Sequence, residues 1–212
     1  MIKLGNILIA IYGLTTVVVF GIMVYFGGLF DSVHTLLFRE ISFLISPYSL
    51  TEYITVPLYK IYNINLLMFS LVLLFRMRNI FARLGALYLS MSAVSSLLLI
   101  TIPMDAIQLS RSMSGLSHIF ASLLTAFYIV IALILFGFGF KKNKHLKRLA
   151  RYSFHLSYVM LFAGFLTGVF AMLSMPEYVG LFQKLPIAAF LLWIVMTVFW
   201  MLRSDNRISY VH

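Results

Sequence analysis

The sequence KKNKHLKRLAR, residues 141–151, lies between two apolar runs, residues 117–140 and 152–175. A helix needs about 20 mostly apolar residues to cross the hydrocarbon core of a membrane. A short basic loop between two such runs is typical of the cytoplasmic side, because positive charge is retained there during insertion. The stretch therefore predicts a hairpin of two membrane-spanning helices with its loop in the cytoplasm.

The apolar pattern continues on both sides of this hairpin. The chain is 62% hydrophobic and 10% charged, whereas soluble domains carry about 25% charged residues. The runs lack the alternation of a membrane β-strand, and the first is too long for a signal-peptide core and has no cleavage site. We therefore expect an all-α integral membrane protein with a single transmembrane domain over residues 1–212. Its six predicted spans are 7–28, 53–75, 84–103, 117–140, 152–175 and 185–202.

The basic residues predict the orientation of the six helices. With both termini in the cytoplasm, 12 basic residues fall inside and four fall outside, which is the bias expected for a multi-pass protein of the cell membrane. The inside set comprises Lys3, Arg76, Arg78, Arg83, Arg203 and Arg207 with the basic loop, and the outside set comprises Arg39, Lys60, Arg111 and Lys184. The net charge of +10 thus indicates topology, and we expect no nucleic-acid partner.

The basic loop allows two interpretations. Its six cations are Lys141, Lys142, Lys144, Lys147, Arg148 and Arg151. Each Lys or Arg near an anionic membrane surface contributes about 1 kcal/mol of attraction, so the loop could bind lipid head groups. We favour the simpler interpretation, a topological anchor.

The connection between the first two spans predicts a short amphipathic helix in the first outer loop. Val33, Leu36, Leu37, Ile41 and Leu44 recur at helical spacing, so the helix would lie on the outer surface or fold over the bundle. After it, Ser49 and Glu52 have the S-x-x-E spacing of a capping box for the second span.

Small residues predict where helices pack closely. Gly164 and Gly168 form a G-x-x-x-G in the fifth span, which allows another helix to approach. Packing within the chain is favoured over dimerisation. The serines of the third span form a comparable small face, and the short connections predict that sequential helices are antiparallel neighbours.

The spanning segments provide little for catalysis. No ionisable residue falls in the middle of a predicted span, which argues against a proton or ion relay. The chain has no Cys, no G-x-S-x-G and no phosphate-binding loop. A haem is not expected, because His118 and His155 open their spans on opposite sides of the membrane and cannot be paired axial ligands.

Polar residues do gather at the predicted outer side. Asp105 ends the third span and His118 opens the fourth, so a tight hairpin places them at similar depth. Such a set could ligate zinc, act as an acid and base pair, or form a latch that satisfies helix ends. Without a H-x-x-x-H or H-E-x-x-H spacing, a latch or ligand-binding role is favoured over a metal site. The ligand-binding candidates are Asp105, His118, His34, Lys60, Glu40 and Glu52, and the zinc candidates are His34, His118 and Asp105.

Four segments also resemble a known family. REISFLISPYS, YNINLLMFSLVLL, IPMD at residues 102–105 and GLSHIFASLL from Gly115 are similar to the bacterial membrane family called domain-of-unknown-function 998. The resemblance implies several helices, a Pro-x-Asp ending the third span and a Gly-x-x-His opening the fourth. It would single out Pro103, Asp105, Gly115 and His118, while the order Glu40, Ile41, Ser42 differs from the Ser-Glu order of the family. The family has no settled activity.

Three functions follow as hypotheses. The leading one is a non-enzymatic membrane protein whose outer pocket binds a lipid, a small ligand or a partner, including a second copy or another membrane protein. The second is a metal-dependent hydrolase acting on lipid at the outer leaflet, and the third is an uncoupled facilitator of a small solute. The membrane hydrolases that include alkaline ceramidases are a weaker comparison, because they have seven helices and a paired-His motif that this chain lacks.

Overall fold

The structure, a computed structural model, describes residues 2–29, 41–102, 112–173 and 176–203. In these ranges it contains seven helices and no strand, which confirms the all-α prediction. Six helices are long and apolar enough to cross a membrane. They are α1 (Ile2–Gly28), α4 (Glu52–Arg76), α5 (Ile80–Leu98), α6 (Met113–Lys141), α7 (Lys147–Met172) and α8 (Pro176–Arg203), and the seventh is the short α3 (Ile41–Leu44).

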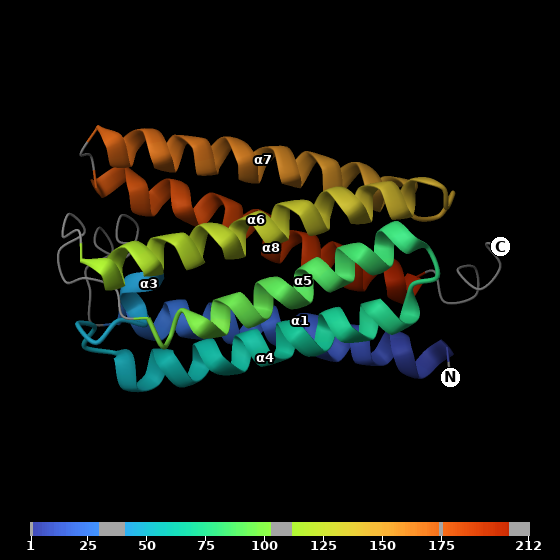
Figure 1. Cartoon of the computed structure of the whole chain (residues 1–212). Coiled ribbons are helices and arrows are strands. Elements are labelled where there is room, and N and C mark those ends of the chain that lie inside the picture. Colours follow the sequence, from blue (N-terminus) through green and yellow to red (C-terminus); the bar gives the residue numbers. More distant parts are fainter. Residues whose placement is uncertain (1, 30–40, 103–111, 174–175, 204–212) are drawn as a thin grey trace.

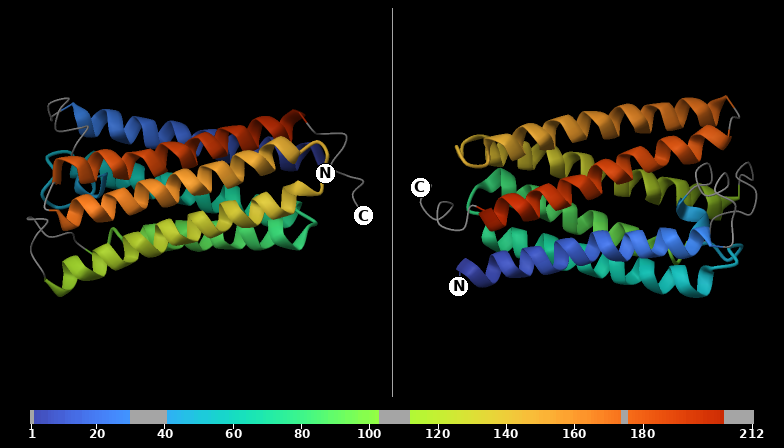
Figure 2. Two further views of the ribbon diagram at one scale, coloured as in Figure 1. Left: turned by 90° about the horizontal axis from the view of Figure 1, so that it is seen from above. Right: turned by 180° about the vertical axis from the view of Figure 1, so that it is seen from behind.

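The six long helices form a closed ring. Each packs against the next along the chain, and α8 returns to pack against α1 (Figures 1 and 2). Asn6 links α1 to both of its neighbours. Its Nδ2 donates to the Met201 carbonyl of α8 over 3.1 Å, and its Oδ1 accepts from Arg76 Nε of α4 over 3.4 Å. The prediction that sequential helices are antiparallel neighbours is confirmed.

Aromatic side chains fill the middle of the ring. Trp193 of α8 is fully buried, with its ring centroid 4.9 Å from that of Phe136 on α6 and 6.5 Å from that of Phe69 on α4. Its Nε1 donates to Ser153 Oγ on α7 over 2.8 Å. One residue of α8 therefore contacts three other helices, and its polar atom is satisfied inside the protein, as a buried indole requires.

Serines join α5 to both of its neighbours. Ser92, Ser95 and Ser96 are buried, as the predicted small face requires. The Ser96 hydroxyl is hydrogen-bonded to the Tyr59 hydroxyl of α4, and Thr125 of α6 donates to Ser95 over 3.0 Å. Hydrogen bonds of this kind help hold helices together in lipid, where apolar surface alone provides no preference for protein over acyl chains.

Glycines permit close packing, but not where the G-x-x-x-G pattern predicts it. A Cβ added at Gly139 of α6 would lie 2.7 Å from the Ala82 backbone nitrogen of α5. At Gly164 and Gly168 the added Cβ meets no atom of the described chain within 4 Å. The predicted intramolecular role of these two glycines is therefore wrong, because α7 packs through its other side and leaves them exposed.

The third span begins and ends earlier than the predicted range 84–103. Asn79 caps its start, with Oδ1 accepting from the Phe81 amide over 2.9 Å, and α5 ends at Leu98. Residues 99–102 then form a turn. Asn is a favoured N-cap residue, so the capping side chain, and not hydropathy, sets the boundary.

The sixth span begins at Pro176, ahead of the predicted start at residue 185. Proline suits the first turn of a helix because the missing N–H would have no helical partner there. The predicted span began next to Pro186, which lies inside α8 in the structure. The first, second and fourth spans extend the predicted ranges by up to about a turn and a half, and the fifth begins earlier than predicted, at Lys147, and ends at Met172, before the predicted residue 175.

The short helix α3 packs into one end of the ring. The Ile41 amide donates to Gln183 Oε1 of α8 over 3.1 Å, and the Thr55 hydroxyl of α4 donates to the Leu44 carbonyl. The Leu44 side chain lies against Gly27 of α1. The chain thus folds over the bundle here, while the amphipathic pattern predicted between residues 33 and 37 lies outside the described residues.

The two ends of the ring differ in charge. Arg76 and Arg203 lie at the end of the bundle that holds the loop at residues 142–146, and we call this the basic end. Both the Ile2 end of α1 and the Arg203 end of α8 are there. The opposite end, which holds α3, is the predicted outer end.

The glycine contacts predict a difference between two matched substitutions. Gly139→Ala should lower the free energy of unfolding by about 1–3 kcal/mol, because the new methyl meets a backbone that cannot move away. Gly164→Ala should leave stability unchanged or raise it by up to about 1 kcal/mol, since alanine favours the helix and nothing obstructs it. Thermal unfolding in detergent, followed by tryptophan fluorescence, compares them, and equal effects would contradict the packing described above.

The predicted orientation can be tested with single cysteines, because the chain contains none. Leu50, 78% exposed near α3, and Lys144, exposed in the basic loop, lie at opposite ends. We expect a membrane-impermeant maleimide to label Leu50→Cys on intact cells and Lys144→Cys only after permeabilisation. The reverse pattern would overturn the orientation without affecting the fold.

Candidate functional site

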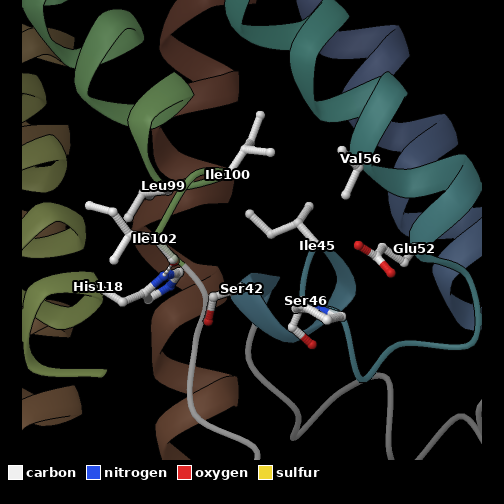
Figure 3. Close-up of a pocket in the computed structure, with 10 residues that line it drawn as sticks. Ser42, Ile45, Ser46, Glu52, Val56, Leu99, Ile100, Ile102 and His118 are labelled. Carbon is white, nitrogen blue, oxygen red and sulfur yellow. Dashed lines mark hydrogen bonds between the residues drawn. The ribbon is translucent and has the colours of Figure 1, made fainter. Parts of the chain in front are cut away.

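A pocket lies at the predicted outer end, between α3 and three long helices (Figure 3). Its walls come from α3 and the turn after it, the first two turns of α4, the residues after α5 and the first turns of α6. The cavity has a volume of about 60 Å³, whereas a single water needs about 10–15 Å³. It can therefore hold a small polar group.

His118 and Ser46 are the buried polar residues of this pocket. Ser112 caps α6 by accepting from the Gly115 amide over 3.0 Å, which starts the helix just before His118. The imidazole is 5% exposed, and its Nδ1 lies 2.7 Å from the Ile102 carbonyl oxygen. Because a carbonyl oxygen can only accept, Nδ1 carries a proton. Nε2 is buried and has no hydrogen-bond partner among the residues that the structure describes, so in the neutral imidazole it is an acceptor that none of them uses.

Glu52 lies on the opposite wall, at the start of α4. The predicted capping box is wrong, because Thr51 is the N-cap residue and its side chain makes no capping bond. Ser49 Oγ instead accepts from the Thr51 amide over 3.3 Å. The carboxylate of Glu52, which a capping box would have directed to the backbone, lines the pocket instead (Figure 3).

The remaining walls are apolar or carry hydroxyl groups. Ser46 Oγ donates to the Phe43 carbonyl over 2.8 Å, which leaves its oxygen lone pairs as acceptors. Ile45 and Val56 provide apolar surface. Among the described lining residues none is Lys or Arg. The site therefore offers acceptors and one negative charge to whatever enters it.

The structure brings together two of the predicted site residues. His118 and Glu52 line the same pocket. Lys60 is exposed on α4, about 12 Å further along the helix axis than Glu52 at 1.5 Å per residue, and does not line the pocket. Three candidates lie outside the described residues and stay predictions: His34, Glu40 and Asp105. Within the described ranges, no three His, Cys, Asp or Glu residues form a metal-binding group.

Sequence reasoning missed several contributors to the pocket. Ile102 acts through its backbone carbonyl, for which the side chain gives no signal. Ser42 and Ser46 come from α3 and the turn after it, for which no binding role was predicted. The sequence signal for this segment was the resemblance of REISFLISPYS to the family.

The basic loop forms the second candidate surface. Its six predicted head-group ligands are all exposed: Lys141, Lys142, Lys144, Lys147, Arg148 and Arg151. Asn143 and Leu146 are buried beneath them, and Asn143 Oδ1 accepts from the His145 amide over 2.9 Å. The loop is thus held by its own side chains, and binding of anionic head groups by its cations stays a prediction.

The hydrogen bond to Ile102 predicts the tautomer of His118. Neutral His118 should carry its proton on Nδ1, with Nε2 bare, because the carbonyl fixes the donor. Nitrogen NMR of protein labelled in histidine measures this directly, with His118→Ala to assign the signal and the exposed His145 and His155 for comparison. A signal from Nε2–H in the neutral ring would contradict the described geometry.

Comparison with known proteins places the chain in a family. The family model described as "Protein of unknown function (DUF998)" matches residues 44–200, which span the chain from the end of α3 to near the end of α8. The match includes Glu52, His118 and most of the pocket. No curated protein and no solved structure matches the chain significantly. Since the match covers well over half of the 212 residues, the chain belongs to the domain-of-unknown-function 998 family.

Proposed function

We propose that this protein is a non-enzymatic, multi-pass membrane protein that binds a small ligand or lipid head group in the pocket at its predicted outer end. The observation that carries the proposal is His118, which lines this pocket and whose buried Nε2 has no hydrogen-bond partner among the described residues. A buried polar atom left unpaired costs about 1–3 kcal/mol. A ligand that donates to Nε2 would recover that free energy.

The construction of the pocket supports binding. Its residues come from four separate parts of the chain, α3, α4, the end of α5 and α6, so a bound ligand would contact several helices at once. The site combines apolar walls with a few convergent polar groups, which is typical of ligand pockets. Its place at the end of the bundle would make it accessible from outside the cell or from the outer leaflet.

Chemistry at the site has less support. Ser46 uses its hydroxyl proton for the Phe43 carbonyl, so it is not prepared as a nucleophile with His118 as its base. Glu52 and His118 lie on opposite walls (Figure 3), whereas paired acid and base groups must both reach the reacting atoms. Binding therefore explains the arrangement with fewer requirements.

A metal-dependent hydrolase acting on outer-leaflet lipid is the second candidate. One observation favours it: metal-binding histidines usually donate their other ring N–H to a carbonyl or carboxylate, as His118 Nδ1 does to Ile102. Catalytic zinc needs about three protein ligands. Glu52 is the other ligand available in the described part of the pocket. The predicted ligands His34 and Asp105 are not among the residues that the structure describes.

Pocket occupancy can be tested without knowing the ligand. Purified protein would be incubated with total lipid extract and with the small-molecule filtrate of the expression host, and bound species identified by native mass spectrometry. We expect to find a bound species. The substitution Val56→Phe, which fills the pocket, should reduce the amount of this species at least tenfold. Ile64→Phe, at an exposed position of the same helix, should retain the bound species. If Val56→Phe perturbs folding, His118→Gln serves as the second variant, and it should weaken the binding.

Two outcomes would overturn the proposal. One is that no bound species distinguishes Val56→Phe from Ile64→Phe. The other is zinc at one ion per chain that is lost in His118→Ala, measured by elemental analysis of the same preparation, which would favour the hydrolase.

A further inference from the structure

We propose that the ligand of this pocket carries a primary ammonium group. The inference rests on the proposed binding function and names the chemistry of its ligand. The group would be held by the Glu52 carboxylate, with His118 Nε2 and Ser46 Oγ as further acceptors. No other described part of the molecule, neither the buried core nor the basic loop, combines hydrogen-bond acceptors and a negative charge with a cavity in this way.

The polarity of the walls selects a ligand rich in donors. Glu52 is the only charged side chain among the described lining residues, and its carboxylate accepts hydrogen bonds only. His118 offers a bare Nε2 because its donor is used by Ile102. An ammonium group has three N–H donors and no acceptor, and its hydrogen bond to a carboxylate is of the strong, charge-assisted kind.

Anions and neutral acceptors do not match these walls. An anion such as phosphate would require Lys, Arg or several N–H groups, and the described lining contains neither Lys nor Arg. Lys60 is exposed on α4 and lies outside the pocket. A phosphate in this small cavity would also be repelled by the negative charge of the Glu52 carboxylate.

Quaternary ammonium groups are also a poor match. Proteins bind them through the faces of Trp, Tyr and Phe side chains. The described lining residues include no Phe, Tyr or Trp. Discrimination should therefore depend on N–H donors in addition to charge, which separates ethanolamine from choline.

The positions of the two groups restrict the shape of the ligand. Figure 3 shows His118 on the α6 side of the pocket and Glu52 on the α4 side, with Ser42 and Ile45 between them. A ligand with its ammonium at Glu52 would reach Nε2 through a second donor or through one water, which bridges nearly as well as a direct hydrogen bond. The cavity of about 60 Å³ accommodates an ethanolamine-sized group with such a water.

Two sources supply this chemistry at the outer end of a membrane protein. One is a free amine in solution, and the other is the head group of phosphatidylethanolamine in the leaflet. In the first arm of the test, ethanolamine and choline are titrated into delipidated protein in detergent by calorimetry. In the second arm, native mass spectrometry counts lipids retained from nanodiscs that contain equal amounts of phosphatidylethanolamine and phosphatidylcholine.

We expect a primary ammonium to bind in at least one arm, at least tenfold more tightly than its trimethylated counterpart. Glu52→Gln, which keeps the shape and removes the charge, should weaken this binding at least tenfold. Lys60→Gln changes the charge of the same helix outside the pocket and should have less than a twofold effect. Binding of ethanolamine in detergent identifies a free amine as sufficient, whereas binding only in nanodiscs identifies the lipid head group.

The inference fails if neither arm shows a primary ammonium bound, if choline binds equally well, or if Glu52→Gln has no effect. Its failure is distinguishable from that of the proposed function. A different species that Val56→Phe excludes would leave the pocket as a binding site and replace only its ligand. If no species depends on Val56→Phe, both proposals are wrong.

Discussion

Every polar group buried among these helices must find its partner inside the protein, because hydrocarbon offers none. The helical backbone meets this requirement within each segment, and side chains meet it between segments. Trp193 donates to Ser153, Thr125 donates to Ser95, and Asn6 donates to the Met201 carbonyl. Each of these bonds joins two different helices, so satisfying the polar groups and fixing the ring are the same event.

The same requirement makes the exceptions informative. Within the described ranges, the buried side-chain atoms without a partner include Nε2 of His118, Oδ1 of Asn63, the Thr197 hydroxyl and Nε1 of Trp200. The Nδ2 of Asn63 donates to the Tyr59 carbonyl over 2.9 Å, which leaves its Oδ1 as the unpaired atom. His118 alone among the four lines the described pocket at the end of the bundle. An unpaired atom in the packed core only lowers stability, whereas one in a residue that lines a cavity lies close to where a ligand would bind.

Hydropathy predicted the six helices, because insertion into a membrane depends on it. The short connections predicted their antiparallel neighbours, and four short motifs predicted the family. They could not predict which face of a helix meets a neighbour. Gly164 and Gly168 have a packing pattern yet lie on the exposed face of α7, while Gly139, which has no such motif, contacts Ala82. Whether a glycine packs depends on the rotation of its helix, which the sequence of that helix does not contain.

The candidate site was partly predictable for a related reason. His118 and Glu52 stood out as ionisable residues near helix ends, and the structure places both in one pocket. The hydrogen bond that fixes the tautomer of His118 is made by the backbone carbonyl of Ile102. Glu52 lines the pocket and does not take part in a capping box, because the N-cap residue of α4 is Thr51 and not Ser49. Both facts depend on the residue at which a helix starts or stops, which is the least predictable feature of a helix.

The contact between α1 and α8 also has a consequence for biosynthesis. Asn6 and Met201 are separated by 195 positions along the chain, so α1 is synthesised long before α8 and lacks this neighbour until α8 enters the membrane. Until then, the face of α1 that later contacts α8 is open to lipid. A chain cut short before α8 would lack the contact that closes the ring, and its α1 would keep that face turned to the surrounding membrane.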